Sequence, residues 1–153
     1  MNTRKWFNIH ISKIFLVFFI SILLMISCSY SEEKDVKQSV VSFAQNYFNL
    51  RYKQAISACT PESEKWVCFK ATNITQEDID IYNAYENSAE CRIESIELND
   101  DKATVIVEVH QFLCCDSIGK PGYICPKAKT QINLIKIGEK WLVDLQSPLT
   151  TYI

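Results

Sequence analysis

The sequence predicts an α+β domain in which N-terminal helices pack on an antiparallel sheet of about four strands. Two periodicities carry this prediction. Apolar residues recur every three or four positions over residues 36–55, which is typical of an amphipathic helix. From residue 90 onward they alternate with polar residues, which is typical of strands with one buried face. The chain has 153 residues, three glycines and four prolines, which suits one globular domain and not a disordered or fibrous chain.

The first 27 residues have the layout of a secretory signal peptide. Residues 1–13 carry three basic side chains and no acidic one, and residues 14–26 form an apolar run interrupted only by Ser21. A run of this length suits a signal peptide and is short for a membrane-spanning helix. The alternative is an uncleaved membrane helix that continues through residues 27–30.

The letters MISC at residues 25–28 resemble the lipobox of bacterial lipoproteins. This resemblance implies cleavage before Cys28 and acylation of that residue, and several acyl chains anchor a protein stably to a membrane. Residues 28–35 would then form a lipidated N-terminus and a polar linker. Ser29 stands where lipoproteins of the inner membrane often carry Asp. The expected location is therefore the cell envelope, on the periplasmic or surface face of the outer membrane.

Cleavage at this position would leave an acidic protein. The removed segment holds three of the 16 basic residues and none of the 18 acidic ones, which leaves 13 basic against 18 acidic residues, a net charge of −5. An acidic chain without a basic tract is poorly suited to bind nucleic acid, and it repels anionic lipid. We therefore expect no nucleic-acid partner, and a membrane contact that depends on the N-terminal lipid.

The domain itself, residues 36–153, should begin with helices. The apolar stripe predicts a long helix that breaks near residues 49–52 and continues as a shorter one. Residues 62–73 predict a third helix, because their acidic start suits the positive end of a helix. The capping signature Thr75-x-x-Asp78 predicts a fourth, short helix.

The second half predicts four strands joined by turns. Residues 90–99 and 102–114 alternate on either side of the dipeptide DD, and residues 129–137 and 140–145 flank the dipeptide GE, which is typical of a tight hairpin. The cysteine-rich segment 114–125 between the two pairs is rich in turn residues and predicts a long loop.

Three segments, at residues 40–59, 93–109 and 132–145, resemble the opening helices and the two hairpins of the nuclear-transport-factor-2-like (NTF2-like) fold, also called cystatin-like. The resemblance covers residues 36–146. It implies that the sheet curves around the long helix and forms a cone with an apolar interior, in which a small molecule could bind. The fold also hosts catalysis in some proteins and does not by itself choose a function. The loop at 114–125 departs from the family pattern and is expected to cover or reshape one end of the sheet.

Seven cysteines indicate an oxidising compartment or metal binding. After lipidation of Cys28 an even number remains, which can pair completely. No C-x-x-C spacing is present, so disulfides are favoured over a zinc site or a thioredoxin-type redox site. We expect no metal and no cofactor. The disulfide candidates are Cys59, Cys68, Cys91, Cys114, Cys115 and Cys125.

Six cysteines allow many connectivities, and the sequence does not choose among them. The preferred bridge joins Cys125 to Cys114 or Cys115 across the predicted loop, and a second could link the two helix cysteines. Cys91 should lie opposite residues 108–110. Its partner, either the remaining vicinal cysteine or a helix cysteine, stays open.

Few residues could carry catalysis. His110 is the only histidine after the signal peptide, and it shares the polar face of its strand with Glu108. A carboxylate, Glu108 or Asp144, could act as a base with Tyr47 or Tyr82 as proton donor, but no spacing singles these residues out. We therefore expect no enzymatic activity.

Binding is the function that the sequence favours. Tyr82 and Tyr85 stand among four acidic residues and suggest an exposed recognition patch. The candidate pocket or recognition residues are Tyr47, Tyr82, Tyr85, Glu108 and His110. The chain is expected to be a membrane-anchored, disulfide-stabilised envelope lipoprotein that binds a small apolar ligand or an envelope protein. The alternatives are an inhibitor or accessory lipoprotein acting through the loop at 114–125, and a proton-transfer enzyme with its site in the cone.

Overall fold

The computed structural model describes residues 31–115 and 119–152. The chain divides into two compact units, Met1–Lys34 and Asp35–Ile153. The predicted signal peptide and Cys28 lie outside the described residues. Among the residues described, no helix is both long enough and apolar enough to span a bilayer. The second unit contains the buried core, which starts at Val36, so it can be studied as an isolated domain.

The first helix is described from residue 31 to residue 48 and buries the apolar stripe that the sequence predicted. Its buried positions lie three or four residues apart, so they fall on one side of the helix; they are Val36, Val40, Phe43, Ala44, Tyr47 and Phe48. Leu50 follows with a left-handed φ of 58°, a conformation common just after a helix C-terminus. The predicted break at residues 49–52 is confirmed.

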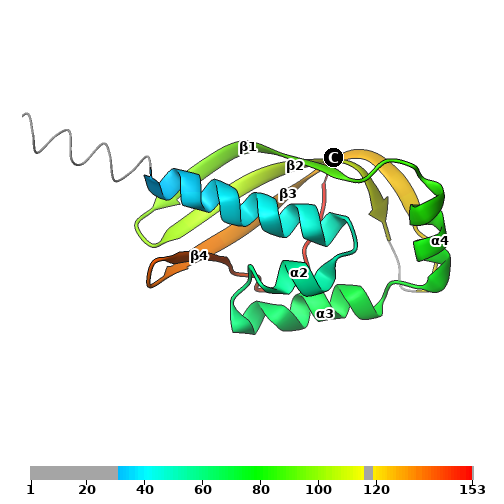
Figure 1. Cartoon of the computed structure of the whole chain (residues 1–153), viewed down its shortest axis with the longest axis horizontal. Coiled ribbons are helices and arrows are strands. Elements are labelled where there is room, and N and C mark those ends of the chain that lie inside the picture. The colour runs from blue at the N-terminus through cyan, green and yellow to red at the C-terminus, as the bar shows by residue number, and fades with distance from the viewer. Residues whose placement is uncertain (1–30, 116–118, 153) are drawn as a thin grey trace, which may run out of the picture. The chain divides into compact units, whose positions relative to one another are not determined.

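Shorter helices follow the first one along the chain (Figure 1). α2 spans Tyr52–Ile56, α3 spans Glu64–Thr72 and α4 spans Gln76–Ala84. A 3₁₀ turn at Pro61–Ser63 leads into α3. Each helix was predicted, and each is too short to be stable alone, so its stability depends on packing within the domain.

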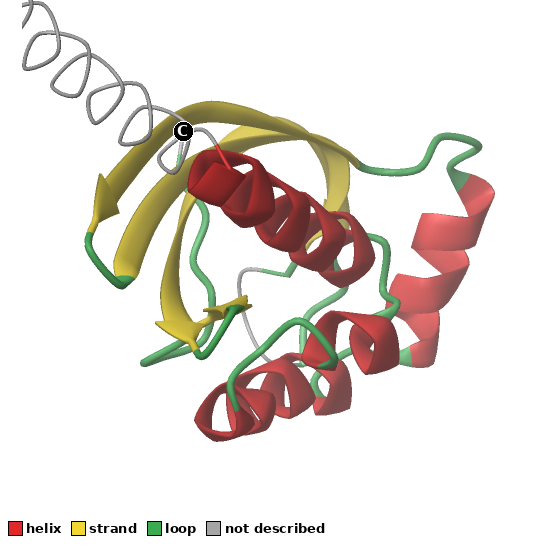
Figure 2. Ribbon diagram, turned by 60° about the vertical axis from the view of Figure 1, so that its left-hand side comes forward, coloured by secondary structure: helices red, strands yellow, loops and turns green. Residues whose placement is uncertain are grey.

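Four strands form one antiparallel sheet in chain order, β1-β2-β3-β4. β1 spans Glu90–Asn99, β2 spans Lys102–Cys114, β3 spans Tyr123–Ile137 and β4 spans Lys140–Val143. Figure 2 shows the sheet curving around one side of the first helix. The predicted class is thereby confirmed: helices pack on a curved antiparallel sheet of four strands.

The core lies between the first helix and the concave face of the sheet. Alternate residues of β2 and β3 point into it, as period-two alternation requires; they include Val105, Val107, Val109, Ile132 and Leu134, each at most 2% exposed. Cys91 lies opposite Val109, as the sequence predicted from the turn at the end of β1.

The alternation of β2 changes phase once, at Gln111. The inward positions run to Val109 and resume at Phe112, three residues further on. Gln111 between them has a left-handed φ of 55°, which interrupts the extended backbone and bends the strand, although the register with β3 does not shift. The matching point on β3 is Pro126, which has no N–H to donate to the ladder. The bend turns the last residues of β2 toward the end of the first helix.

The structure shortens the loop predicted at residues 114–125. β2 continues to Cys114 and β3 already begins at Tyr123, so the two strands pair almost to the connection between them. The glycines and prolines of this segment indicated turns, but the β2–β3 ladder continues past Gln111 without a shift of register and ends at the pair Cys114–Tyr123.

Two segments outside the four strands pair with the β3–β4 side of the sheet. Beyond the short β4, the edge of β3 is paired by the C-terminal segment, where Tyr152 exchanges two backbone hydrogen bonds with Lys129, of 2.7 and 2.8 Å. The outer edge of β4 is paired by residues 58–60, through Val143. Covering an edge in this way prevents it from pairing with another chain.

Candidate functional site

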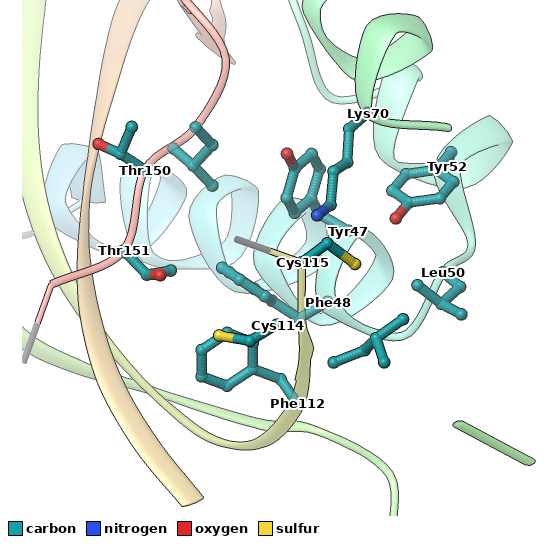
Figure 3. Close-up of a pocket in the computed structure, with 12 residues that line it drawn as sticks. Tyr47, Phe48, Leu50, Tyr52, Lys70, Phe112, Cys114, Cys115, Thr150 and Thr151 are labelled. Atoms are coloured by element: carbon teal, nitrogen blue, oxygen red, sulfur yellow. The ribbon is translucent and has the colours of Figure 1, made fainter. Parts of the chain in front are cut away.

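A cleft opens where the bent end of β2 meets the end of the first helix. Its main cavity has a volume of about 300 Å³, and a second cavity of about 160 Å³ shares four of its lining residues. The lining comes from the first helix, α2, α3, the end of β2 and the C-terminal segment (Figure 3). The residues that line the main cavity are Tyr47, Phe48, Leu50, Tyr52, Lys70, Phe112, Leu113, Cys114, Cys115, Leu149, Thr150 and Thr151.

Four aromatic rings form a packed wall of the cleft. The ring centroid of Tyr47 lies 5.3 Å from that of Phe48 and 5.6 Å from that of Tyr52, and both pairs have edge-to-face geometry. Phe48 packs in the same manner on Phe112, at 5.2 Å. These distances are within the favourable range for aromatic pairs. The wall is therefore rigid and largely apolar, which suits contact with an apolar molecule.

Charged groups are scarce in the cleft, although several lining side chains carry a hydroxyl or a thiol. Lys70 is the only charged side chain among the residues lining either cavity. Burial raises the pKa of the Tyr47 and Tyr52 hydroxyls well above their usual value, and the nearby Cys115 adds to the shift. Both hydroxyls are therefore protonated at neutral pH and can act as hydrogen-bond donors.

Asp78 holds the connection between β2 and β3 next to the cleft. Its carboxylate accepts hydrogen bonds from the N–H and the hydroxyl of Thr75, each 2.8 Å, and from the N–H of Gly122, 2.7 Å. Burial raises the pKa of Asp78, but the hydrogen bonds from Thr75 and Gly122 outweigh it and lower the pKa. A Cβ at Gly122 would lie 2.6 Å from the backbone oxygen of Cys114, so only glycine fits this approach.

Asn49 joins the end of the first helix to the start of β1. Its amide nitrogen donates to the carbonyls of Gln45 and Ala89, at 2.7 and 3.1 Å. Its amide oxygen accepts from the N–H of Ala89, at 2.9 Å, and from the hydroxyl of Tyr82, at 2.7 Å. Asn49 is 7% exposed, and all four of its hydrogen-bonding positions are used.

The predicted pocket residues fall into three places. Tyr47 lines the cleft. Tyr82 donates to Asn49, and Tyr85 stands half-buried at the end of α4, so neither lines either cavity of the cleft. Glu108 and His110 lie on the convex face of the sheet, opposite to the side that carries the core.

Glu108 and His110 belong to an ion-pair network with Lys127. Glu108 oxygens lie 2.6 Å from Lys127 Nζ and 2.6 Å from His110 Nε2. Hydrogen bonds lower the pKa of Glu108 to about 2, and the bond from Lys127 contributes more than the bond from His110. Asp144, the other carboxylate considered as a base, accepts from Gln146 outside the cleft. Neither cavity of the cleft is lined by a carboxylate or a histidine of the described chain.

No disulfide joins any two of the six cysteines in the described part of the chain. In the β2–β3 ladder, Cys125 lies opposite Phe112 and Cys114 lies opposite Tyr123. The two cysteines are therefore diagonal neighbours, whose Cβ atoms are too far apart for a disulfide. The preferred bridge is absent from the structure, and its formation after export stays a prediction that would require the strand ends to shift. The described residues also contain no group of three or more metal-ligating side chains.

Sequence reasoning missed much of the cleft. Tyr52, Lys70 and the segment 149–151 were not predicted, because they come from helices and a tail that are far apart along the chain. Lys70 stands in the last turn of α3, where a basic residue is common for reasons of helix electrostatics alone. The tail follows the last predicted strand and has no periodicity that could have indicated a role.

No protein-family model and no curated protein matches the chain. Two solved structures are similar to it in fold. A candidate NTF2-like transpeptidase from Campylobacter jejuni is 20% identical, with a TM-score of 0.48, and the match covers 72% of this chain and 97% of that one. A de novo designed protein with a curved β-sheet is 10% identical, with a TM-score of 0.41, covering 76% and 97%. At these values the similarity concerns the arrangement of elements and implies nothing about activity.

Proposed function

We propose that the domain binds a small, largely apolar ligand in the cleft, and that a lipid on Cys28 tethers it to a membrane of the cell envelope. The observation that carries the first part is the main cavity of about 300 Å³ with its wall of packed aromatic rings. Ligand sites are typically concave, mostly apolar, and at least of this volume.

The composition of the lining supports binding over catalysis. The ionisable groups that line the main cavity are one lysine, two tyrosines and two cysteines. A tyrosine with a raised pKa is a weak acid at neutral pH, and general acid–base catalysis works best with a pKa near the working pH. The aromatic wall, by contrast, offers a large contact area without any rearrangement.

Binding can be tested with two probes that share one aromatic body, neutral 2-naphthalenemethanol and anionic 2-naphthoate. Residues 31–153 would be titrated with each probe by isothermal calorimetry. We expect saturable binding at one site by at least one probe. Leu149→Asn places a polar group in the cleft and should weaken this binding about tenfold.

The matched control is Leu142→Asn. Leu142 is a half-buried leucine that lines a separate groove beside β4. This change should leave the affinity for both probes unaltered. Absence of binding by both probes, or equal losses in the two variants, would contradict the proposed ligand site.

The tether has its own experiment. Cells expressing the full chain would be labelled with an alkyne-bearing fatty acid, and the isolated protein would be examined for the label. Cys28→Ser should abolish labelling, whereas Cys68→Ser, which changes an exposed cysteine of α3, should retain it. Equal labelling of both variants would rule out Cys28 as the acylated residue.

A further inference from the structure

Lys70 carries the one positive charge among the residues that line the cleft. It extends from α3 toward Tyr47 and Cys115 (Figure 3), and it lines both cavities together with them. Among the described residues, no carboxylate forms an ion pair with its amine. It attracts Asp78 through space, but the Asp78 oxygens already accept three hydrogen bonds. The amine therefore remains available to a negative group in the cleft.

Tyr52 supplies a second donor in the same wall. Its hydroxyl oxygen is buried and makes no hydrogen bond within the described chain. Buried polar groups of native proteins nearly always have a partner, and an exception calls for an explanation. Since burial keeps this hydroxyl protonated at neutral pH, it lacks an acceptor. An acceptor atom of a ligand would meet this need.

We propose, building on the ligand site inferred above, that the ligand is a small amphipathic acid. Its carboxylate would pair with the Lys70 amine and accept a hydrogen bond from the Tyr52 hydroxyl, while its apolar body lies against the aromatic wall. Hydrogen bonds between charged groups are stronger than neutral ones, and a site partly shielded from water strengthens them further. The wall gives contact area, and the two donors select for the acidic head group.

The two naphthalene probes separate this proposal from the ligand site itself, because they differ only in the head group. We expect the wild-type domain to bind 2-naphthoate about tenfold more tightly than 2-naphthalenemethanol. Lys70→Met keeps most of the apolar stem and removes the charge, so it should abolish this preference while binding of the neutral probe persists. Lys65→Met is the matched control, because Lys65 lies on the same helix over the Trp66 ring, outside the cleft.

Tyr52→Phe tests the second donor. It should weaken 2-naphthoate binding several-fold and the neutral probe less, because an alcohol oxygen is a poorer acceptor than a carboxylate. It should not lower the unfolding temperature of the ligand-free domain, since it removes a hydroxyl that has no partner in the described chain. A purely structural role for Tyr52 would instead lower the unfolding temperature and affect both probes alike.

The outcomes distinguish the two proposals. Equal affinity for both probes, or a preference that survives in Lys70→Met, overturns the acid proposal and leaves the ligand site standing. Loss of both probes in Lys70→Met would show that the lysine acts only as part of the wall, which also overturns it. Binding of neither probe to the wild-type domain contradicts both proposals.

Discussion

Asn49 and Tyr52 are three residues apart, yet the side chain of one is fully hydrogen-bonded and the hydroxyl of the other is not hydrogen-bonded within the described chain. Asn49 is buried with every donor and acceptor position bonded inside the domain. Tyr52 lies in the wall of the cleft, and its buried hydroxyl has no hydrogen-bond partner in the described chain. The first arrangement is complete without a ligand, and the second is not. The difference supports a structural role for the Asn49 cluster and the binding role proposed for the cleft.

Removal of the Asn49 side chain should have the largest effect on stability. Asn49→Ala leaves the N–H and C=O of Ala89 and the hydroxyl of Tyr82 without their partner. We expect the free energy of unfolding to fall by about 3 kcal/mol, because buried polar groups would become unsatisfied. Urea denaturation would measure the change. Asn46→Ala is the control, because the Asn46 side chain donates to the Ser42 carbonyl in an exposed bond on the same helix. An equal loss of stability there would contradict the special role of Asn49.

Asp78→Asn should have an intermediate effect that depends on pH. The variant puts an amide nitrogen against the Thr75 donors, or against the Gly122 N–H, and should cost about 2 kcal/mol at neutral pH. The folded pKa of Asp78 is lowered from 3.8, so the charged form stabilises the domain at neutral pH. This stabilisation is lost as the pH falls through the lowered pKa.

The difference between wild type and Asp78→Asn should therefore shrink below about pH 4. Urea denaturation at several pH values would follow it. Asp80→Asn changes an exposed carboxylate on the same helix that accepts only from Gln76, and it should alter stability little at any pH. A difference that stays constant down to acid pH would show that the Asp78 charge is not responsible.

Glu108→Gln should have the smallest effect. Glu108 lies on the convex face, where water screens its pairs with Lys127 and His110. Its pKa of about 2, against 4.5 normally, implies that the pairs stabilise the domain above about pH 4.5 and that this contribution disappears as the pH falls through 2. We expect a change in the unfolding midpoint smaller than in either buried variant. NMR titration of the carboxyl group would check the pKa, and a normal value would show that the network does not persist in solution.

The elements of the fold were predictable because their patterns are local. The stripe from Val36 to Tyr47 identifies a helix, and the alternation through Val105, Val107 and Val109 identifies a strand, each within one stretch of chain. The Thr75–Asp78 box could be recognised for the same reason. The bend at Gln111 could not be predicted, since a glutamine carries no sign that its φ will be positive.

The cleft was much less predictable, because it is assembled from the ends of elements. Tyr47 was a candidate from helix spacing, but Lys70 and Leu149 reach the same space only after α3 and the tail have packed. The Glu108–His110 pair was recognisable as two ionisable residues on one strand face, yet that face is the convex one. The ionisable pair that its spacing made recognisable thus lies away from the cleft, and the cleft is formed by segments that are distant from one another in sequence.

The C-terminal segment belongs both to the lining of the cleft and to the cover of the β3 edge. Residues 149–151 line the cleft, while Tyr152 pairs with Lys129 and the Thr130 hydroxyl donates to the Thr150 carbonyl. If this short segment dissociated from β3, the cleft would lose one wall and the β3 edge would lose its cover at the same time. An exposed strand edge can pair with a strand of a second molecule. A ligand that contacts Leu149 would stabilise the C-terminal segment in its paired position. Ligand binding would therefore also reduce aggregation of the protein.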